Sequence, residues 1–259
     1  MANFTQNNAQ AQSFVKNNER IQQLKFQTKG LTPYWIADMD FPVFKEITSE
    51  LQKTIGKEIY AYQMRSEEEL QAIGSWFSKR HKYFTECSPI TFQSGVLSSL
   101  SFVINIFSEA NQGVIIQPPV YHAFASTITG MGRKVIDNPL KKGEHNYEID
   151  FNHLETLFSV EDNKIFILCH PHNPIGQFWT NNDLQKIIDL GEKHNVLIIS
   201  DEIHGDVIFE GDFKSILSFS KCQHNKIIVL NSFAKTFGLP ALADAYVFTT
   251  NVELHRKIK

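Results

Sequence analysis

The sequence predicts an α/β fold in which a mostly parallel sheet is covered on both faces by helices. Two observations support this prediction. Short runs rich in β-branched residues alternate with stretches of helical periodicity through the middle of the chain. The runs 165–169 (IFILC) and 196–199 (VLII) are apolar at every position, whereas a strand with one face in water would alternate apolar and polar residues.

The elements follow one another in the order expected of such a fold. Seven β-branched runs are expected to be strands, at 90–93, 113–117, 134–137, 164–169, 196–200, 226–231 and 245–249. Six helices are expected, at 44–55, 67–80, 96–107, 122–130, 151–158 and 181–194. Residues 1–30 are rich in Asn and Gln and are expected to form an arm or a short helix.

The composition excludes several classes of protein. With 259 residues, 42% of them hydrophobic and 12% aromatic, the chain can bury a large core and is not a disordered chain. No stretch reaches the roughly 18 apolar residues of a membrane span, and the polar start MANFTQNNAQAQ lacks the apolar segment of a secretory signal. A net charge of −3 gives no basic surface for nucleic acid. Cys87, Cys169 and Cys222 form no CxxC motif, so we expect a reduced, cytoplasmic protein.

Ligands of parallel sheets bind beyond the carboxyl ends of the strands, so residues that follow the predicted strands are candidates for a site. Ser94 and Gly95 form a small turn that opens the helix beginning at Val96. Such a turn offers backbone N–H groups to a phosphate, although the same residues also serve as an ordinary helix cap. Tyr121 offers a flat face to an aromatic ligand, or else packs in the core.

The turn after strand 164–169 is rigid, because two prolines and a glycine restrict residues 170–176 and hold Asn173. Cys169, His170 and His172 also permit a metal site, but no second ligand cluster with suitable spacing accompanies them. The sequence therefore predicts no metal.

Two charged residues follow buried strands. Asp201 comes after an apolar strand, where a carboxylate is costly unless it is paired, so it either caps the next turn or holds a cationic group of a ligand. Lys235 lies among small residues after strand 226–231. It is either a solvated surface lysine or a buried one whose lowered pKa makes its amine a nucleophile or a base.

Together these residues place an anion-binding turn, an aromatic ring, an amide, a carboxylate and a lysine at one edge of one sheet. Pyridoxal 5′-phosphate (PLP) needs this set of groups. Its phosphate binds N–H groups, its ring stacks on an aromatic side chain, its ring oxygen takes an amide donor, its pyridinium nitrogen pairs with a carboxylate, and its aldehyde bonds to a lysine.

The sequence resembles the PLP-dependent enzymes of the class I/II aminotransferase fold, and among them the cystathionine β-lyase-like C–S lyases. The resemblance implies a three-layer α/β/α fold with the mostly parallel seven-stranded sheet of the aspartate aminotransferase-like large domain. The matching strings are 35–41 (WIADMDF), 60–62 (YAY), 117–121 (QPPVY), 169–176 (CHPHNPIG), 201–204 (DEIH) and 232–237 (SFAKTF).

The resemblance also implies roles for individual residues. Lys235 would bond to the cofactor aldehyde and act as general base, Asp201 would pair with the pyridinium nitrogen, and Tyr121 would stack on the ring. Tyr62 would reach the phosphate of the neighbouring subunit, which implies a homodimer. The other residues implied at the cofactor are Ser94, Gly95, Val96, Asn173, His204 and Ser232.

The reaction that the resemblance implies is α,β-elimination from cystathionine or a cysteine-type amino acid, which yields pyruvate, ammonia and a thiol. Partners are then a small amino-acid substrate and a second copy of the chain, with no nucleic acid and no membrane. Two alternatives stay open: an aminotransferase on the same scaffold, and a non-catalytic protein that keeps the PLP fold for binding or regulation. A nucleotide-binding Rossmann enzyme is disfavoured, since no GxGxxG follows a strand.

Two departures from the family pattern bear on activity. The family continues beyond Lys259 into a small domain that carries the arginine for the substrate carboxylate, so we expect an N-terminal arm at 1–33, a PLP-binding large domain at 34–259, and no C-terminal small domain. Ala243 stands where the family usually has a Lys or Arg near the phosphate. Loss of one charge-assisted bond costs about 1.5–3 kcal/mol, so we expect weak activity or none from a shortened chain.

Overall fold

The computed structural model describes residues 13–82, 90–219, 226–242 and 244–259. The start of the expected N-terminal arm, Cys87, Cys222 and Ala243 lie outside the described residues. No helix in the described part of the chain has the length and apolar character needed to cross a membrane.

Contacts divide the chain into two compact units. The first unit comprises Met1–Gln63 together with Phe233–Leu242, and the second comprises Met64–Ser232 together with Ala243–Lys259. These units do not divide at residues 33 and 34, and the assignment of 34–259 to one cofactor-binding domain stays a prediction. The segment Phe233–Leu242 of the first unit directly follows Ser232, the last residue of a central strand of the second unit.

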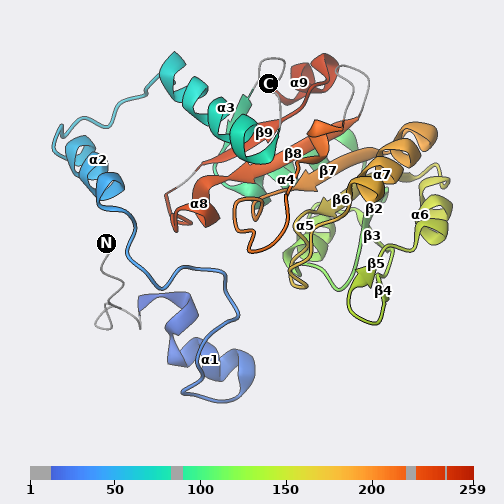
Figure 1. The fold of residues 1–259 in the computed structure, drawn as a ribbon, viewed down its shortest axis with the longest axis horizontal. Helices are drawn as coiled ribbons and strands as arrows, with labels where there is room; N and C mark the ends of the chain where they lie inside the picture. Colours follow the sequence, from blue (N-terminus) through green and yellow to red (C-terminus); the bar gives the residue numbers. More distant parts are fainter. Residues whose placement is uncertain (1–12, 83–89, 220–225, 243) are drawn as a thin grey trace. The chain divides into compact units, whose positions relative to one another are not determined.

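The second unit is built on a seven-stranded, mostly parallel sheet, as the sequence predicts (Figure 1). Strand β9 is antiparallel to both of its neighbours, β1 and β8, and the other pairs are parallel. The carboxyl ends of β1, β2, β6, β7 and β8 therefore lie at the same edge. The strands in spatial order are β1 (Ile90–Gln93), β9 (Ala245–Phe248), β8 (Ile227–Ser232), β7 (Leu197–Asp201), β6 (Asn163–Cys169), β2 (Gly113–Ile116) and β3 (Lys134–Asp137).

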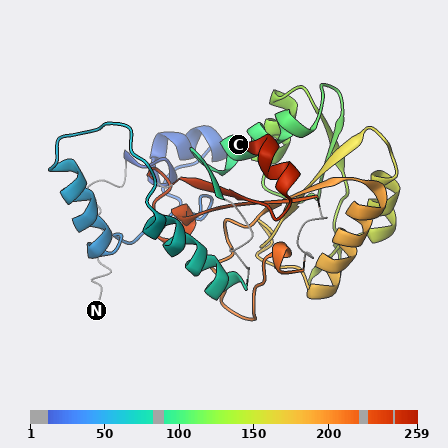
Figure 2. The ribbon, with the colours of Figure 1, turned by 90° about the horizontal axis from the view of Figure 1, so that it is seen from above.

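Helices cover both faces of this sheet (Figure 2). On one face α4 (Val96–Phe107) packs against α5 (Ala123–Gly130) and α9 (Val252–Ile258). On the other face α6 (Phe151–Phe158) packs against α7 (Asn181–His194). Helix α3 (Glu67–His81) lies on this second face, since its Phe77 contacts the rings of Tyr246 and Phe248 while Val247 faces α4. The predicted three layers are confirmed.

The central strands are continuously apolar because each face of the sheet is buried. In β6, Ile165, Ile167 and Cys169 belong to the core under α4 and α5. Phe166 points the other way and meets Phe158 of α6, with ring centroids 5.4 Å apart. Successive side chains of a strand alternate between faces, so a strand buried on both needs no polar positions.

Short elements add to the predicted set. The first unit holds the 3₁₀-helix η2 (Val15–Asn17) and the helices α1 (Glu19–Phe26), α2 (Lys45–Ile55) and α8 (Phe233–Thr236). The second unit adds a hairpin of β4 (Lys141–Lys142) and β5 (Tyr147–Glu148), and the 3₁₀-helix η3 (Ile216–Ser218). Most of these span too few residues to show a period in the sequence.

Candidate active site

Strand pairing brings most of the predicted residues of the second unit to one edge of its sheet. Gln93 at the end of β1 and Ser232 at the end of β8 both pair with Ala245 of β9, so the turn after β1 begins near Ser232. Cys169 at the end of β6 pairs with Asp201 at the end of β7. The edge at which the candidates meet is therefore the carboxyl edge that parallel sheets use for ligands.

The turn before α4 has the geometry of an anion site. Gly95 has a φ of 118°, a conformation that disfavours any residue with a side chain, and a Cβ added there would meet no atom within 4 Å. Gly95 is the N-cap of α4, and no side chain caps this end of the helix. The first turn, which begins at Val96, therefore has N–H groups without a capping side chain, and the exposed Ser94 precedes this turn.

Consecutive carboxylates at the end of β7 are directed to opposite faces of the sheet. Asp201 has the parity of Leu197 and Ile199, which lie in the core under α4 and α5, and its residue is only 6% exposed. Its Oδ1 accepts a hydrogen bond of 3.1 Å from the Ile203 N–H. Glu202 is on the other face, where its Oε1 accepts from the Ile216 N–H at 2.9 Å.

Tyr121, Cys169 and Asn173 lie in the surroundings of Asp201. Burial and then the charge of Asp201 raise the pKa of the half-buried Tyr121 phenol. The same two causes, in the same order, raise the pKa of the Cys169 thiol. The Asn173 N–H donates to Cys169 Sγ at 3.3 Å. The structure therefore brings together the aromatic ring, the amide turn and the carboxylate that the sequence singled out, around a neutral phenol and a neutral thiol.

The two histidines of the turn after β6 hold backbone groups. His170 Nδ1 accepts from the Trp179 N–H at 3.2 Å and its Nε2 donates to the Lys214 carbonyl at 3.1 Å, while burial lowers its pKa to about 4. His172 Nε2 donates to the Pro119 carbonyl at 2.9 Å, and burial lowers its pKa too. This second bond ties the turn of Asn173 to the turn of Tyr121. Within the described ranges, no three His, Cys, Asp or Glu side chains are grouped to hold a metal ion.

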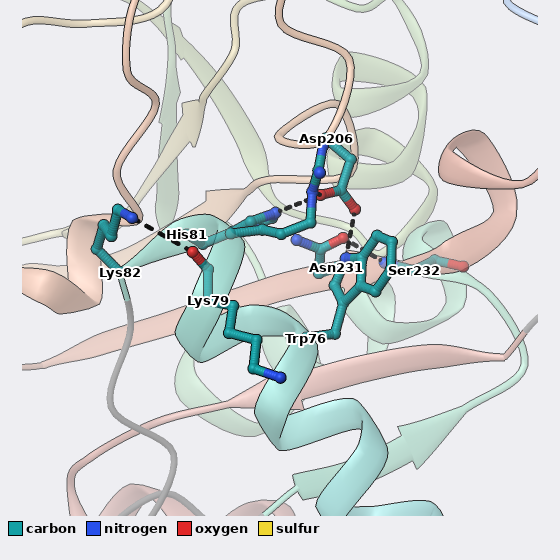
Figure 3. A network of polar contacts seen from close by, with 8 residues as sticks. Trp76, Lys79, His81, Lys82, Asp206, Asn231 and Ser232 are labelled. Atoms are coloured by element: carbon teal, nitrogen blue, oxygen red, sulfur yellow. Dashed lines mark hydrogen bonds and ion pairs between the residues drawn. The ribbon is translucent and has the colours of Figure 1, made fainter.

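A buried carboxylate that the sequence did not single out anchors the turn after β7 (Figure 3). The Asp206 side chain is 3% exposed and accepts three hydrogen bonds of 2.9 Å, from Trp76 Nε1, Arg80 Nε and His81 Nε2. All three donors come from the last turns of α3. The half-buried His204 lies in the same turn as Asp206, so α3 holds the segment that carries both Asp201 and His204.

The role of Asp206 could not be predicted from the sequence, because its hydrogen-bond donors lie about 125 residues away in the chain. Its only local signal is a second acidic residue shortly after an apolar strand. Another polar pair in this region is local: the Ser232 N–H donates to Asn231 Oδ1 at 2.7 Å, and the buried Nδ2 of Asn231 has no hydrogen-bond partner among the described residues (Figure 3).

Lys235 belongs to the first unit, where the WIADMDF string surrounds it. Its side chain is 21% exposed, and its Nζ donates to the Ala37 carbonyl at 3.2 Å and lies 3.7 Å from Asp38 Oδ1. Lys16 steadies the same string by donating to the Asp38 carbonyl and to Asp40 Oδ2, both at 2.8 Å. Asp38 was not among the predicted site residues, although it lies in a string that carried the resemblance.

Tyr62 also belongs to the first unit and is fully exposed. The candidates thus fall into two sets. Lys235 and Tyr62 lie in the first unit, and the other predicted residues lie in the second.

Comparison with known proteins identifies the family. The family model for aminotransferase class I and II matches residues 36–258. Cystathionine beta-lyase PatB of Bacillus subtilis (strain 168) is 36% identical over 208 residues, which cover 77% of this chain and 54% of that protein. Protein MalY of Escherichia coli (strain K12) is 34% identical over 228 residues, which cover 88% of this chain and 58% of that protein.

Among solved structures, cystalysin from Treponema denticola, which contains a pyridoxal 5′-phosphate cofactor, superposes with a TM-score of 0.89 at 27% identity. The match covers 100% of this chain and 66% of that one. The chain spans just over half the length of the two curated relatives. Because the family match takes in all seven strands of the sheet and most of the sequence, this chain belongs to the class I and II aminotransferase family.

Proposed function

We propose that this chain is the cofactor-binding part of a PLP-dependent carbon–sulfur β-lyase. Its substrate is cystathionine or a similar cysteine-type amino acid, and α,β-elimination gives pyruvate, ammonia and a thiol. The observation that carries the proposal is the joint placement of a buried carboxylate, Asp201, and the uncapped α4 N-terminus at one edge of the sheet. The names of PatB and cystalysin support the reaction and the cofactor.

The residues of the second unit fit PLP. The open space in front of Gly95 and the first turn of α4 suit a phosphate, which helix N-termini bind through N–H groups and the helix dipole. Asp201 is buried, and a cationic ring nitrogen beside it would offset the cost of burying its charge. Val96, Ser94 and Ser232 complete the proposed phosphate contacts, and His204 is proposed to lie at the ring.

PLP, when bound, supplies the electron sink that makes the α-proton of an amino acid removable. The proposed site residues then have the following roles. Lys235 Nζ receives the α-proton as general base. Asp201 holds positive charge on the ring nitrogen, and the raised pKa of Tyr121 keeps its phenol neutral, so that it stacks and donates a hydrogen bond. The Asn173 amide donates to the ring oxygen.

The thiol of Cys169 has a passive part in this arrangement. Its raised pKa keeps it neutral beside Asp201, so it adds no second negative charge to the site. A single carboxylate then determines the charge of the heterocycle.

Replacing Lys235 tests the proposal directly. In the PLP-loaded protein we expect Lys235→Ala to lose the visible absorbance of covalently bound cofactor and the release of pyruvate from cystathionine, because no amine remains to bond the aldehyde or to take the proton. Lys142→Ala, on the exposed hairpin strand β4, is the matched control and should keep both. Unchanged absorbance in Lys235→Ala contradicts the assignment.

An aminotransferase is the second candidate, because the family that matches the chain bears that name. Products separate the two reactions. Pyruvate and ammonia released from cystathionine without any keto-acid acceptor support the lyase, whereas product that appears only with an acceptor supports the aminotransferase. Cofactor bound through Lys235 with no turnover of either kind supports a binding or regulatory protein.

We also propose that the protein acts as a homodimer in which Tyr62 contributes to the neighbouring site. The Tyr62 side chain is fully exposed and is therefore available to a second subunit. The nearby Ile59, Tyr60 and Met64 are also exposed apolar side chains, of the kind that subunit contacts cover.

A cytoplasmic location completes the proposal. Cys169 is a free, buried thiol, and free thiols persist in reducing compartments. Fractionation of cells that express the tagged protein tests this point.

A further inference from the structure

A pocket of about 230 Å³ lies at the amino ends of the central strands, at the edge of the sheet opposite Asp201. Its wall includes Leu197, the first residue of β7, and Lys226, which directly precedes β8. The four steps along β7 from Leu197 to Asp201 separate the two edges by about 13 Å, at about 3.3 Å per residue. The pocket is therefore distinct from the candidate active site.

Three lysines from three different elements line this pocket. Lys164 comes from β6, Lys226 directly precedes β8 and Lys257 comes from α9. The chain distances between them show that the fold assembles this cluster and that no local sequence run creates it. The single carboxylate in the wall is Glu253, so among the described residues the wall carries a net charge of about +2 at neutral pH.

The three ammonium groups are not held in direct ion pairs by described carboxylates. None of them takes part in any of the ion pairs of the described chain. The pKa of Lys226 is lowered, by partial burial first and then by the charges of Lys257 and Lys164. The cluster thus stores repulsion that a bound anion would relieve.

The rest of the wall suits a small polar ligand. Leu197 and Leu254 are 4% and 7% exposed and contribute apolar lining, while Asn195 and Asn251 also line the pocket. Water occupies about 30 Å³ per molecule, so the space holds a group of several non-hydrogen atoms but is smaller than the pockets of roughly 300–1,000 Å³ that bind drug-sized ligands. Lysines bind phosphate as point charges.

We propose that this pocket, lined by Lys164, Lys226 and Lys257, binds a small multivalent oxyanion of the phosphate class. The ligand is either a free inorganic ion or the phosphate group of a small ester. The site lies away from the groups that are proposed to hold PLP, and the inference does not rest on the proposed function.

Titration calorimetry on the full chain at constant ionic strength tests the site, after incubation with PLP to occupy the α4 N-terminus. Pyrophosphate is the probe for a free ion and glycerol phosphate is the probe for an ester. We expect saturable binding of at least one, and the tighter of the two identifies the source. Removing one charged contact should weaken binding about 10- to 100-fold, so Lys226→Gln and Lys164→Gln should each show such a loss.

Two further variants sharpen the test. Glu253→Gln removes the opposing carboxylate and should tighten binding several-fold, and Lys193→Gln, an exposed lysine of α7, should leave it unchanged. Thermal melting in sodium chloride shows whether each variant is folded. Equal affinity of the wild-type protein and Lys226→Gln for pyrophosphate would overturn the proposal. It would also be overturned if sodium chloride, at matched ionic strength, raised the melting temperature of the wild-type protein as much as pyrophosphate does.

Discussion

The two adjacent carboxylates at the end of β7 differ in the face of the sheet on which they lie, not in burial. Asp201 and Glu202 are adjacent carboxylates, both almost fully buried, yet only the first lies on the face of the candidate cofactor site. Glu202 Oε2 has no hydrogen-bond partner in the described part of the chain. Burial raises the pKa of Glu202 from its ordinary 4.5 to about 7, against the opposing effects of the Ile216 N–H and of His81.

This raised pKa predicts a pH dependence of stability. Because the folded protein binds the Glu202 proton more tightly than the unfolded chain, its stabilising effect is complete below pH 4.5 and is lost as pH rises through 7. Glu202→Gln should remove this loss. The free energy of unfolding of the variant, relative to that of the wild-type protein, should therefore rise by about 2–3 kcal/mol from pH 5 to pH 8.

Urea unfolding at the two pH values measures the effect. Glu192→Gln, an exposed glutamate of α7, is the control and should follow the wild-type protein. If the difference between Glu202→Gln and the wild-type protein is the same at pH 5 and pH 8, Glu202 does not titrate in this window.

Glycines provide a second matched pair of residues. Gly95 and Gly130 both have free space where a Cβ would go, but only Gly95 has a positive φ. Gly95→Ala should therefore lower the free energy of unfolding by about 1–2 kcal/mol through backbone strain. Gly130→Ala, in a helix, should raise it by about 0.4–1 kcal/mol. Denaturant unfolding compares the two, and equal effects would show that the backbone at Gly95 accepts a side chain without strain.

At the scale of elements, one carboxylate connects α3 to the turn that follows β7. Asp206 is the common acceptor of Trp76, Arg80 and His81. Asp206→Asn removes the negative charge that these donors share. We expect it to lower the free energy of unfolding by about 3 kcal/mol, because removing one partner of a buried charged network leaves the other groups uncompensated.

The exposed Asp212, six residues further along, gives the matched control Asp212→Asn. We expect that change to alter stability by less than about 0.5 kcal/mol. Urea unfolding at pH 7 measures both variants. A loss below about 1 kcal/mol in Asp206→Asn would mean that α3 is held mainly by the packing of Phe77.

The strands and long helices were predictable, because buried elements carry their pattern locally. All seven strands lie within one or two residues of their predicted limits, and α4, α6 and α7 have the predicted limits. The continuous apolar run of β6 indicates burial on both faces without any knowledge of its neighbours. The predicted strand at 196–200 begins and ends one residue later as Leu197–Asp201, since pairing with β6 extends to Asp201.

The rest could not be predicted, because it depends on tertiary contacts. Helix α9 has seven residues and the hairpin strands have two each, which is too short for a period to emerge. The Asp206 network and the three-lysine pocket join residues far apart in the chain. Residues at the site were predictable where they follow strands, as Tyr121, Asn173 and Asp201 do, whereas the contact of Lys235 with Asp38 required the structure.

At the scale of the whole molecule, the first unit has apolar side chains on helix α2 that the first unit itself does not bury. Helix α2 has no buried residue. Leu51 and Ile55 are exposed and four residues apart, which places them on one face of α2, and the N-cap residue Phe44 is exposed too. A face of this kind fits the proposed homodimer.

Ile55→Glu should therefore shift the protein from dimer towards monomer, since it buries a charge in the proposed contact. Lys53→Glu, on the opposite face of α2, breaks an exposed ion pair of small energy and should leave the mass unchanged. Sedimentation equilibrium measures both. A monomeric wild-type protein, or a dimer that Ile55→Glu leaves intact, contradicts the proposed interface.

The opposite directions of Asp201 and Glu202 have a consequence for how this strand can change. Residues 196–199 are apolar throughout, so their sequence does not itself determine which of the two acids faces which side of the sheet. Deleting one residue there would move Glu202 into the place of Asp201 and turn the aspartate to the other face, whereas inserting one would put Ser200 in that place. Either change would remove the carboxylate of Asp201 from the ligand edge, so the site depends on the length of β7 and not only on its apolar composition.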